Sequence, residues 1–218
     1  KGRALVQVGE TFDPSPANID ARTTHLALAN CMPLTLLPKK TRAGAVYAQL
    51  VIRFGDLASL TNKATVSSLT SAMLSRGTAA LTRQQVKDSL DRLKARAVIG
   101  GGGNNVVVAI ETTRDQLPAV LTLVAGELRT PRFDATEFDK LKQEQLAALE
   151  ASKGEPQTLA LIAMQQRMNP YPKGHPMHTL TPEETIAEIG ATTMDQVRQF
   201  HHDFFGASSA DLAVVGDV

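Results

Sequence analysis

The sequence predicts an α+β fold, with one mainly antiparallel sheet of about six strands and helices packed on one face. Several short segments alternate apolar and polar residues, which is typical of half-buried strands. About six or seven longer segments repeat apolar residues every three to four positions, which is typical of amphipathic helices. Because these strands and helices do not alternate strictly, a purely parallel sheet is disfavoured.

The strand predictions depend on alternation and on turn residues. Val46, Ala48 and Ile52 alternate with their neighbours and indicate a long strand. The run of glycines and asparagines from Gly100 to Asn105 favours a turn between two strands. The predicted strands are two short ones within 25–37 around Asn30-Cys31, one over 43–54, two within 97–111 and one over 210–215.

The helix predictions depend on the 3.6-residue period and on residues that begin or end helices. Leu117, Val120 and Val124 share one helical face, and Thr181 and Gly190 are suited to the start and the end of a short helix. The predicted helices cover approximately 62–75, 82–94, 113–128, 136–151, 156–168, 182–190 and 193–204.

The first 23 residues contain Pro14 and Pro16 and show no helical period, so we expect an extended linker from an upstream domain. The chain begins without a methionine or a signal peptide and stops directly after a predicted strand. We therefore expect a piece of a longer protein, with residues 24–218 forming a single α+β domain.

The composition disfavours several classes of partner. A net charge of +1 gives no electrostatic argument for nucleic acid or an anionic membrane. No apolar run is long enough to span a membrane. Cys31 is the single cysteine, which excludes an internal disulfide and a cysteine-based metal site, so we expect it to be a tolerated free thiol.

The segment 66–78, V-S-S-L-T-S-A-M-L-S-R-G-T, is the most informative part of the chain. Leu69 and Met73 share a face with Val66, and Gly77 stands where a helix commonly ends. The ending M-L-S-R-G-T resembles the pitrilysin/insulinase family of zinc metallopeptidases (inverzincins, with a mitochondrial-processing-peptidase-like fold). In active members, H-x-x-E-H directly precedes this ending and supplies two zinc ligands and a general base.

Aligned on that ending, the three motif positions are Ser68, Ser71 and Ala72. Hydroxyl and methyl groups are not zinc ligands, so the resemblance implies a domain that is catalytically inactive and holds no metal. The family's third ligand, a glutamate on the following long helix, would fall at 147–149. Glu150 is close in sequence but points in another direction around the helix.

Further motifs extend the resemblance over residues 24–218. They follow in the family's order: Thr130-Pro131-Arg132-Phe133, Pro170-Tyr171, Glu184-x-Ile186 and Val214–Val218. The family binds extended peptides along a strand edge, which implies a peptide-binding edge at Gly102, Gly103, Asn104 and Asn105.

The resemblance implies a non-catalytic domain of a zinc-dependent metalloendopeptidase that forms part of a peptide-binding chamber. Its partners would be a peptide substrate and a homologous zinc-bearing half, either in the same long chain or in a separate subunit. The domain itself would need no cofactor, and the bacterial periplasm is the expected location. Two alternatives stay open: a purely architectural or assembly subunit without peptide binding, and an enzyme with unrecognised chemistry.

Other residue patterns carry less weight. His175 and His178, with Glu183, could ligate a metal, but Pro176 makes the segment non-helical and an exposed loop is the favoured interpretation. The serines in 67–71 lack the G-x-S-x-G turn of a serine hydrolase. His201 and His202 point in different directions on a helix, so we expect one to pack and one to face solvent.

Overall fold

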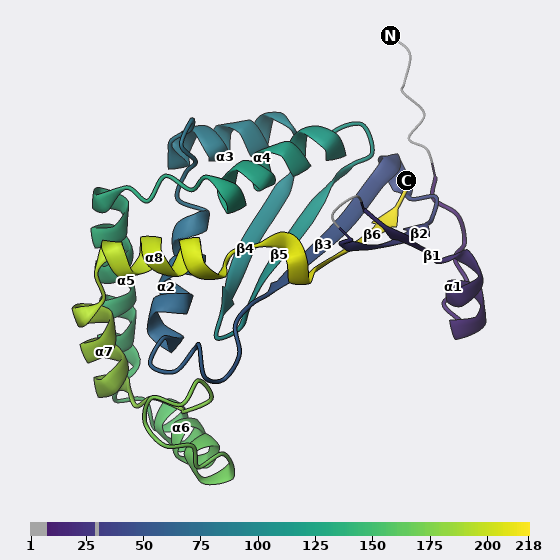
Figure 1. The fold of residues 1–218 in the computed structure, drawn as a ribbon. Helices are drawn as coiled ribbons and strands as arrows, with labels where there is room; N and C mark the ends of the chain where they lie inside the picture. Colours follow the sequence, from purple (N-terminus) through teal and green to yellow (C-terminus); the bar gives the residue numbers. More distant parts are fainter. Residues whose placement is uncertain (1–7, 29–30) are drawn as a thin grey trace.

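The computed structural model describes residues 8–28 and 31–218 and confirms the predicted α+β class. The strands form one six-stranded sheet in the order β1-β2-β6-β3-β5-β4, in which β2 and β6 are parallel and the other neighbours antiparallel (Figure 1). The strands are β1 Thr24–Ala27, β2 Pro33–Pro38, β3 Ala45–Arg53, β4 Arg96–Gly102, β5 Asn105–Thr113 and β6 Ala210–Gly216. The α-helices are α1 Pro16–Arg22, α2 Ala64–Leu74, α3 Arg83–Arg92, α4 Leu117–Arg129, α5 Ala135–Ser152, α6 Pro156–Met168, α7 Pro182–Ala191 and α8 Met194–Phe204.

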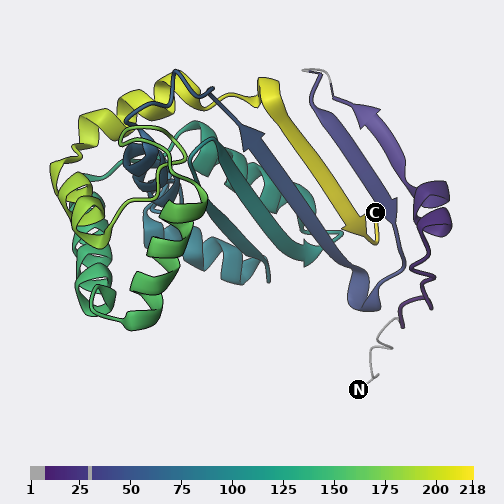
Figure 2. The same cartoon turned by 90° about the horizontal axis from the view of Figure 1, so that it is seen from below.

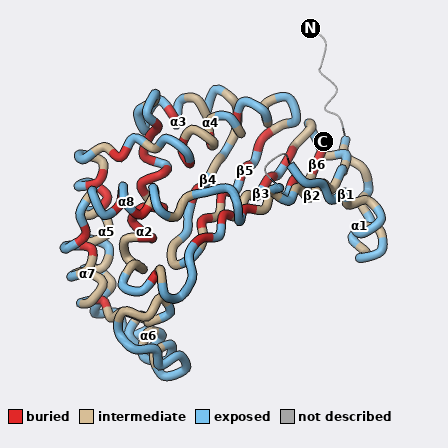
Figure 3. The backbone as a smooth tube through the Cα atoms, viewed as in Figure 1, coloured by how far each residue is buried: buried red, intermediate tan, exposed pale blue. Residues whose placement is uncertain are grey.

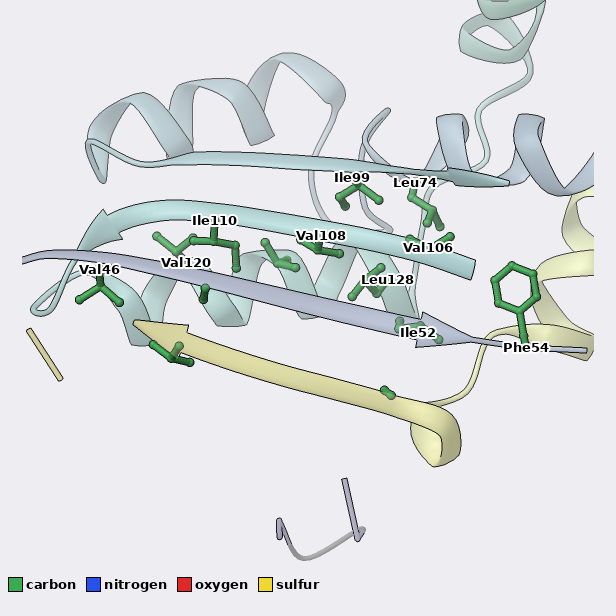
Figure 4. Close-up of a cluster of buried hydrophobic side chains, with 14 of the residues drawn as sticks. Val46, Ile52, Phe54, Leu74, Ile99, Val106, Val108, Ile110, Val120 and Leu128 are labelled. Carbon is green, nitrogen blue, oxygen red and sulfur yellow. The ribbon is translucent and has the colours of Figure 1, made fainter. Parts of the chain in front are cut away.

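The sheet has one covered face and one open face, as its alternating strands predict. Val46, Ala48 and Ile52 of β3 are buried, whereas Tyr47, between them, is 54% exposed. Figure 4 shows the strand side chains meeting Val120 and Leu128 of α4, and Figure 3 shows buried positions along the central strands and along α2. Helices therefore cover one face of the sheet, and the other is left to solvent.

Helix α2 lies beside β4, at one edge of the sheet (Figures 1 and 2). Its Leu74 joins the main core, while Leu69 and Met73 belong to a second buried cluster. That second cluster is completed by Phe133, Phe138, Leu141 and Val197 from the segments before and within α5 and α8. The predicted buried face of this helix is confirmed, and it connects the sheet to the C-terminal helices.

A buried arginine holds the end of α2 against α5. Arg76 is only 7% exposed, and its guanidinium lies 3.3 Å from a carboxylate oxygen of Glu137 and 2.5 Å from one of Glu144. Glu137 is also 3.2 Å from Arg83 and 3.1 Å from Lys140. Each charge in this network has an opposite charge beside it, which a buried ion requires.

The N-terminal segment differs from its prediction. Residues 16–22 form helix α1 and are not extended, because Pro16 lies in the first turn, where a proline is compatible with a helix. Glu10 forms an ion pair with Arg22 at 2.8 Å and accepts a hydrogen bond from the backbone of Lys40 at 3.0 Å. The described part of this segment is therefore packed on the domain, and its connection to an upstream domain stays a prediction.

Two other predictions need correction or lie outside the structure. Helix α4 begins at Leu117 and not at residue 113, because β5 continues to Thr113, which pairs with Ala45 of β3. Asn30, in the predicted first turn, lies outside the described residues, while Cys31 beside it is exposed as a free thiol. Among the helices of the described ranges, none has both the length and the apolar character that crossing a membrane requires.

The β4–β5 hairpin depends on glycine at a position that faces its own partner strand. A methyl group at Gly101 would lie 2.7 Å from the Cα of Val106 and closer still to the carbonyl oxygen of Asn105. A methyl group at Gly100, one residue earlier, would approach no described atom within 4 Å apart from its chain neighbours.

We therefore expect Gly101→Ala to lower the free energy of unfolding by about 1–3 kcal/mol, because the hairpin backbone must move. Gly100→Ala, the matched control, should leave stability unchanged or raise it slightly, since alanine restricts the unfolded chain. Urea titration followed by circular dichroism measures both. Equal stability of the two variants would contradict the close approach of the two strands.

Candidate functional site

Helix α2 places the three motif positions Ser68, Ser71 and Ala72 within about one turn, where they differ in burial and in hydrogen bonding. Ser71 is 1% exposed, and its hydroxyl donates to the backbone carbonyl of Ser67 at 2.9 Å. Ser68 is exposed, and Ala72 is half-buried against the second cluster. Ser68 and Ala72 are one turn apart and so share a face of the helix.

Ser68 lines a cavity of about 230 Å³ between α2, α5, α7 and the loop before α7. Its polar groups include the hydroxyls of Thr65 and Ser68 and the amide of Gln145, while Leu69, Leu180 and Ile189 make it largely apolar. Of the three motif positions, Ser68 lines this cavity, whereas Ser71 and Ala72 do not. The side chains that line the cavity offer no imidazole, thiolate or carboxylate, which are the groups that bind zinc in proteins.

The residue of α5 that lines this cavity is Gln145, about one helical turn before the predicted third-ligand positions. Ala147 and Ala148 are exposed, and Glu150, also exposed, forms an ion pair with Lys153. Gln145 follows Phe138 and Leu141 on the buried side of α5. Leu149, half-buried one turn after Gln145, lies on the same side of the helix, so the third-ligand position at 147–149 stays a prediction.

The predicted peptide-binding edge is only partly an edge. Gly102 ends the outer strand β4, but a methyl group there would lie 2.5 Å from the Ser68 hydroxyl oxygen, so α2 covers this end. The Gly103 carbonyl accepts from Ser67 at 3.0 Å, and the Asn104 carbonyl accepts from the backbone of Phe54 at 2.9 Å. Asn105 lies in the interior strand β5. The part of the β4 edge that this end of α2 leaves uncovered therefore consists of residues before Gly102.

The histidines of the 169–181 loop serve local packing. The His178 ring lies 2.7 Å from the Tyr171 carbonyl and 3.6 Å from the carboxylate of Glu184, not of the predicted Glu183. The His175 ring stacks on Tyr171 and accepts a hydrogen bond from the backbone of Met177. Within residues 8–28 and 31–218, no three histidine, cysteine or acidic side chains gather closely enough to hold a metal ion.

His201 and His202 behave as predicted, one packed and one exposed. His201 stacks on Phe205, lies 2.8 Å from the Leu128 carbonyl through Nε2, and has a pKa lowered by burial. His202 is exposed and pairs with Asp203. The hydroxyls of Ser67 and Ser71 donate to carbonyl oxygens, a geometry that gives neither serine an activating base.

The position of Gln145 predicts how a metal site could be rebuilt. Ser68→His with Ala72→His supplies two ligands one turn apart, and adding Gln145→Glu should tighten zinc binding by about tenfold or more, because a third ligand completes the set. Ala148→Glu on the same double variant is the matched control and should add little. Competition with a chromophoric chelator measures both affinities. A larger gain from Ala148→Glu would favour the predicted third-ligand position at 147–149 over Gln145.

No protein-family model and no curated protein matches the sequence. Solved structures do match it, each over 90% of this chain. A peptidase M16 inactive domain from Pseudomonas fluorescens has a TM-score of 0.76 at 22% identity, with 47% of that chain covered. A protease from Helicobacter pylori has a TM-score of 0.71 at 18% sequence identity, with 46% of that chain covered. The periplasmic protease PqqL from Escherichia coli has a TM-score of 0.73 at 16% sequence identity, with 22% of that chain covered.

The chain therefore spans about half or less of the length of these structures. At these identities the likeness concerns the fold, and it agrees with the six-stranded sheet and the helix order described above. The resemblance inferred from M-L-S-R-G-T and the motifs after it is confirmed at this level: the chain has the fold of the domains that build M16 (pitrilysin/insulinase-type) peptidases.

Proposed function

We propose that this chain is a non-catalytic domain of a larger zinc-dependent peptidase, in which it forms part of a peptide-holding chamber opposite a homologous zinc-bearing half. One observation carries the proposal. Helix α2 keeps its place beside β4 and α5, but its motif positions are Ser68, Ser71 and Ala72. The scaffold of a metal helix is retained while the groups that would bind and use the metal are missing.

The length of the matched structures supports a larger assembly. The chain covers 47% of the Pseudomonas fluorescens structure and 22% of PqqL, so the rest of each of those chains is long enough for at least one further domain of comparable size. The zinc ligands and the general base would then come from a homologous half, in the same chain or in a partner subunit. The description of PqqL as periplasmic supports a periplasmic location for this chain.

Peptide holding is supported by the shape of the sheet. Strand β4 is at the end of the strand order, and its residues before Gly102 are mostly exposed, among them Val98 at 48%. An unpaired strand edge can add an extended peptide through main-chain hydrogen bonds. Tyr47 on the open face adds exposed aromatic surface two strands away from this edge.

An architectural or assembly role is the second candidate, and helix α6 favours it. Leu159, Leu161, Met164 and Met168 on this helix are all between 44% and 70% exposed. α6 projects from the end of the molecule opposite β1 and β2 (Figures 1 and 2). Exposed apolar side chains on one helix are typical of a surface that contacts another protein.

Hydrogen exchange separates the two candidates. If β4 holds peptide, a saturating extended peptide should slow amide exchange in residues 96–101 of the 218-residue chain, because added main-chain bonds protect those amides. The amides of α6 serve as the internal control and should not change. Unchanged exchange along β4, together with binding of a homologous domain that protects α6, would instead support the architectural role.

The longer protein provides a second test. Leu69 is fully buried, so Leu69→Ala should cost about 2–5 kcal/mol and reduce peptide hydrolysis carried out by the zinc-bearing half. Ser68→Ala and Ser71→Ala should leave turnover nearly unchanged, because the proposal gives these hydroxyls no chemical role. Turnover and melting temperature are measured together. Loss of activity in either serine variant at an unchanged melting temperature would refute the non-catalytic assignment.

A further inference from the structure

A second cavity, of about 460 Å³, lies at the opposite end of α2 from Ser68. It is partly open to solvent and is lined by α3, the end of α2, β4, α4 and the start of α5, and its walls include the apolar side chains of Val86, Leu90 and Ala97. Ser75, Gln84 and Glu127 contribute polar groups. Ala97 belongs to the proposed peptide edge as well as to this cavity, but the inference drawn here from the cavity does not depend on the proposed function.

Glu127 is the unusual member of this cavity. The residue is only 2% exposed, and no other side chain or backbone group in residues 8–28 and 31–218 forms a hydrogen bond or an ion pair with its carboxylate. Burial raises its pKa to about 7. Burial of a carboxylate without a partner destabilises the folded state, and the destabilisation is largest when the carboxylate is ionised.

The other charged groups around the cavity already have partners. Glu137 is surrounded by Arg76, Arg83 and Lys140, at 3.3, 3.2 and 3.1 Å. Arg83 and Lys87 line the cavity from α3 but are more than half exposed, and Lys87 lies 4.0 Å from Asp91. The charge that remains uncompensated in the cavity is therefore that of Glu127.

Two further acceptors line the same space. The side-chain nitrogen of Gln84 donates to Asp88 at 2.7 Å, which turns the amide donor outward and leaves its oxygen as an acceptor. The Ser75 hydroxyl donates to the Ala72 carbonyl at 3.5 Å and keeps its own lone pairs. An ammonium group has three donors and no acceptor, so its needs match a carboxylate, an amide oxygen and a hydroxyl oxygen.

We propose that this cavity binds a primary alkylammonium group, supplied by a lysine side chain of a bound polypeptide, with Glu127 as its counter-ion. Val86, Leu90 and Ala97 would contact the methylene stem, as apolar surfaces commonly do for lysine. A divalent metal fits less well, because Glu137 is committed to three cations and Glu127 alone cannot complete a coordination sphere.

The first experiment uses n-pentylammonium chloride as the probe and n-pentanol as its neutral counterpart, with amide chemical shifts of the 218-residue chain as the readout. We expect pentylammonium to shift amides near Ser75, Gln84 and Glu127, and to bind at least about tenfold more tightly than pentanol. Its affinity should rise between pH 6 and pH 8.5, because the probe stays charged while Glu127 ionises.

Glu127→Gln keeps the side-chain volume and removes the charge. It should weaken pentylammonium binding by about tenfold or more and abolish the rise with pH. Glu150→Gln, at an exposed glutamate of α5, is the matched control and should change neither. Equal binding of pentanol and pentylammonium by the wild-type chain would overturn the proposal, as would unchanged affinity in Glu127→Gln. The wild-type comparison decides the question even if the variant fails to fold.

The second experiment tests the polypeptide source. Acetyl-Gly-Lys-Gly-amide should shift the same amides as pentylammonium and lose affinity in Glu127→Gln, whereas acetyl-Gly-Gln-Gly-amide should not bind. Binding of pentylammonium without binding of the lysine peptide would overturn the assignment to a polypeptide side chain.

Discussion

The close approach of helix α2 to the β4–β5 hairpin is the contact on which the rest of the domain depends. It requires small side chains on the helix and glycine residues, such as Gly102, on the strand. Ser67 is fully buried and donates to the Gly103 carbonyl, and Ser68 lies where a side chain at Gly102 would be. Since the helix is thereby fixed against the sheet edge, its other faces are free to carry the second buried cluster and, through Arg76, the start of α5.

This packing fixes α2 against α5 through side-chain contacts. In a catalytic zinc site, ligands on two helices are connected through the ion. Here Leu69 and Met73 meet Phe138 and Leu141 directly, and Arg76 bridges to Glu137 and Glu144. Apolar burial and a satisfied ion network hold the two helices together, so this contact does not depend on a metal ion.

Local periodicity predicted most of the fold, and long-range geometry accounts for what it missed. The alternation at Val46, Ala48 and Ile52 and the helical spacing of Leu69 and Met73 correctly identified buried faces. Counting residues from Ala72 gave 147–149 for the third-ligand position but did not single out Gln145 beside the Ser68 cavity, because a distance along the chain does not show how α5 packs against α2. The covered end of β4 was equally hidden, since the contact between Gly102 and Ser68 joins residues 34 positions apart by number.

Two buried charged residues near the C-terminal end of α2 differ in their partners. Arg76 is fully paired, whereas Glu127 has a carboxyl that burial keeps protonated up to about pH 7. Because the folded chain binds this proton more tightly than the unfolded chain, Glu127 lowers the free energy of unfolding progressively as pH rises from about 4.5 to about 7. Its destabilising contribution is then constant at higher pH. A cation in the cavity would favour the ionised carboxylate and offset this loss, so ligand binding and folding stability are linked through one side chain.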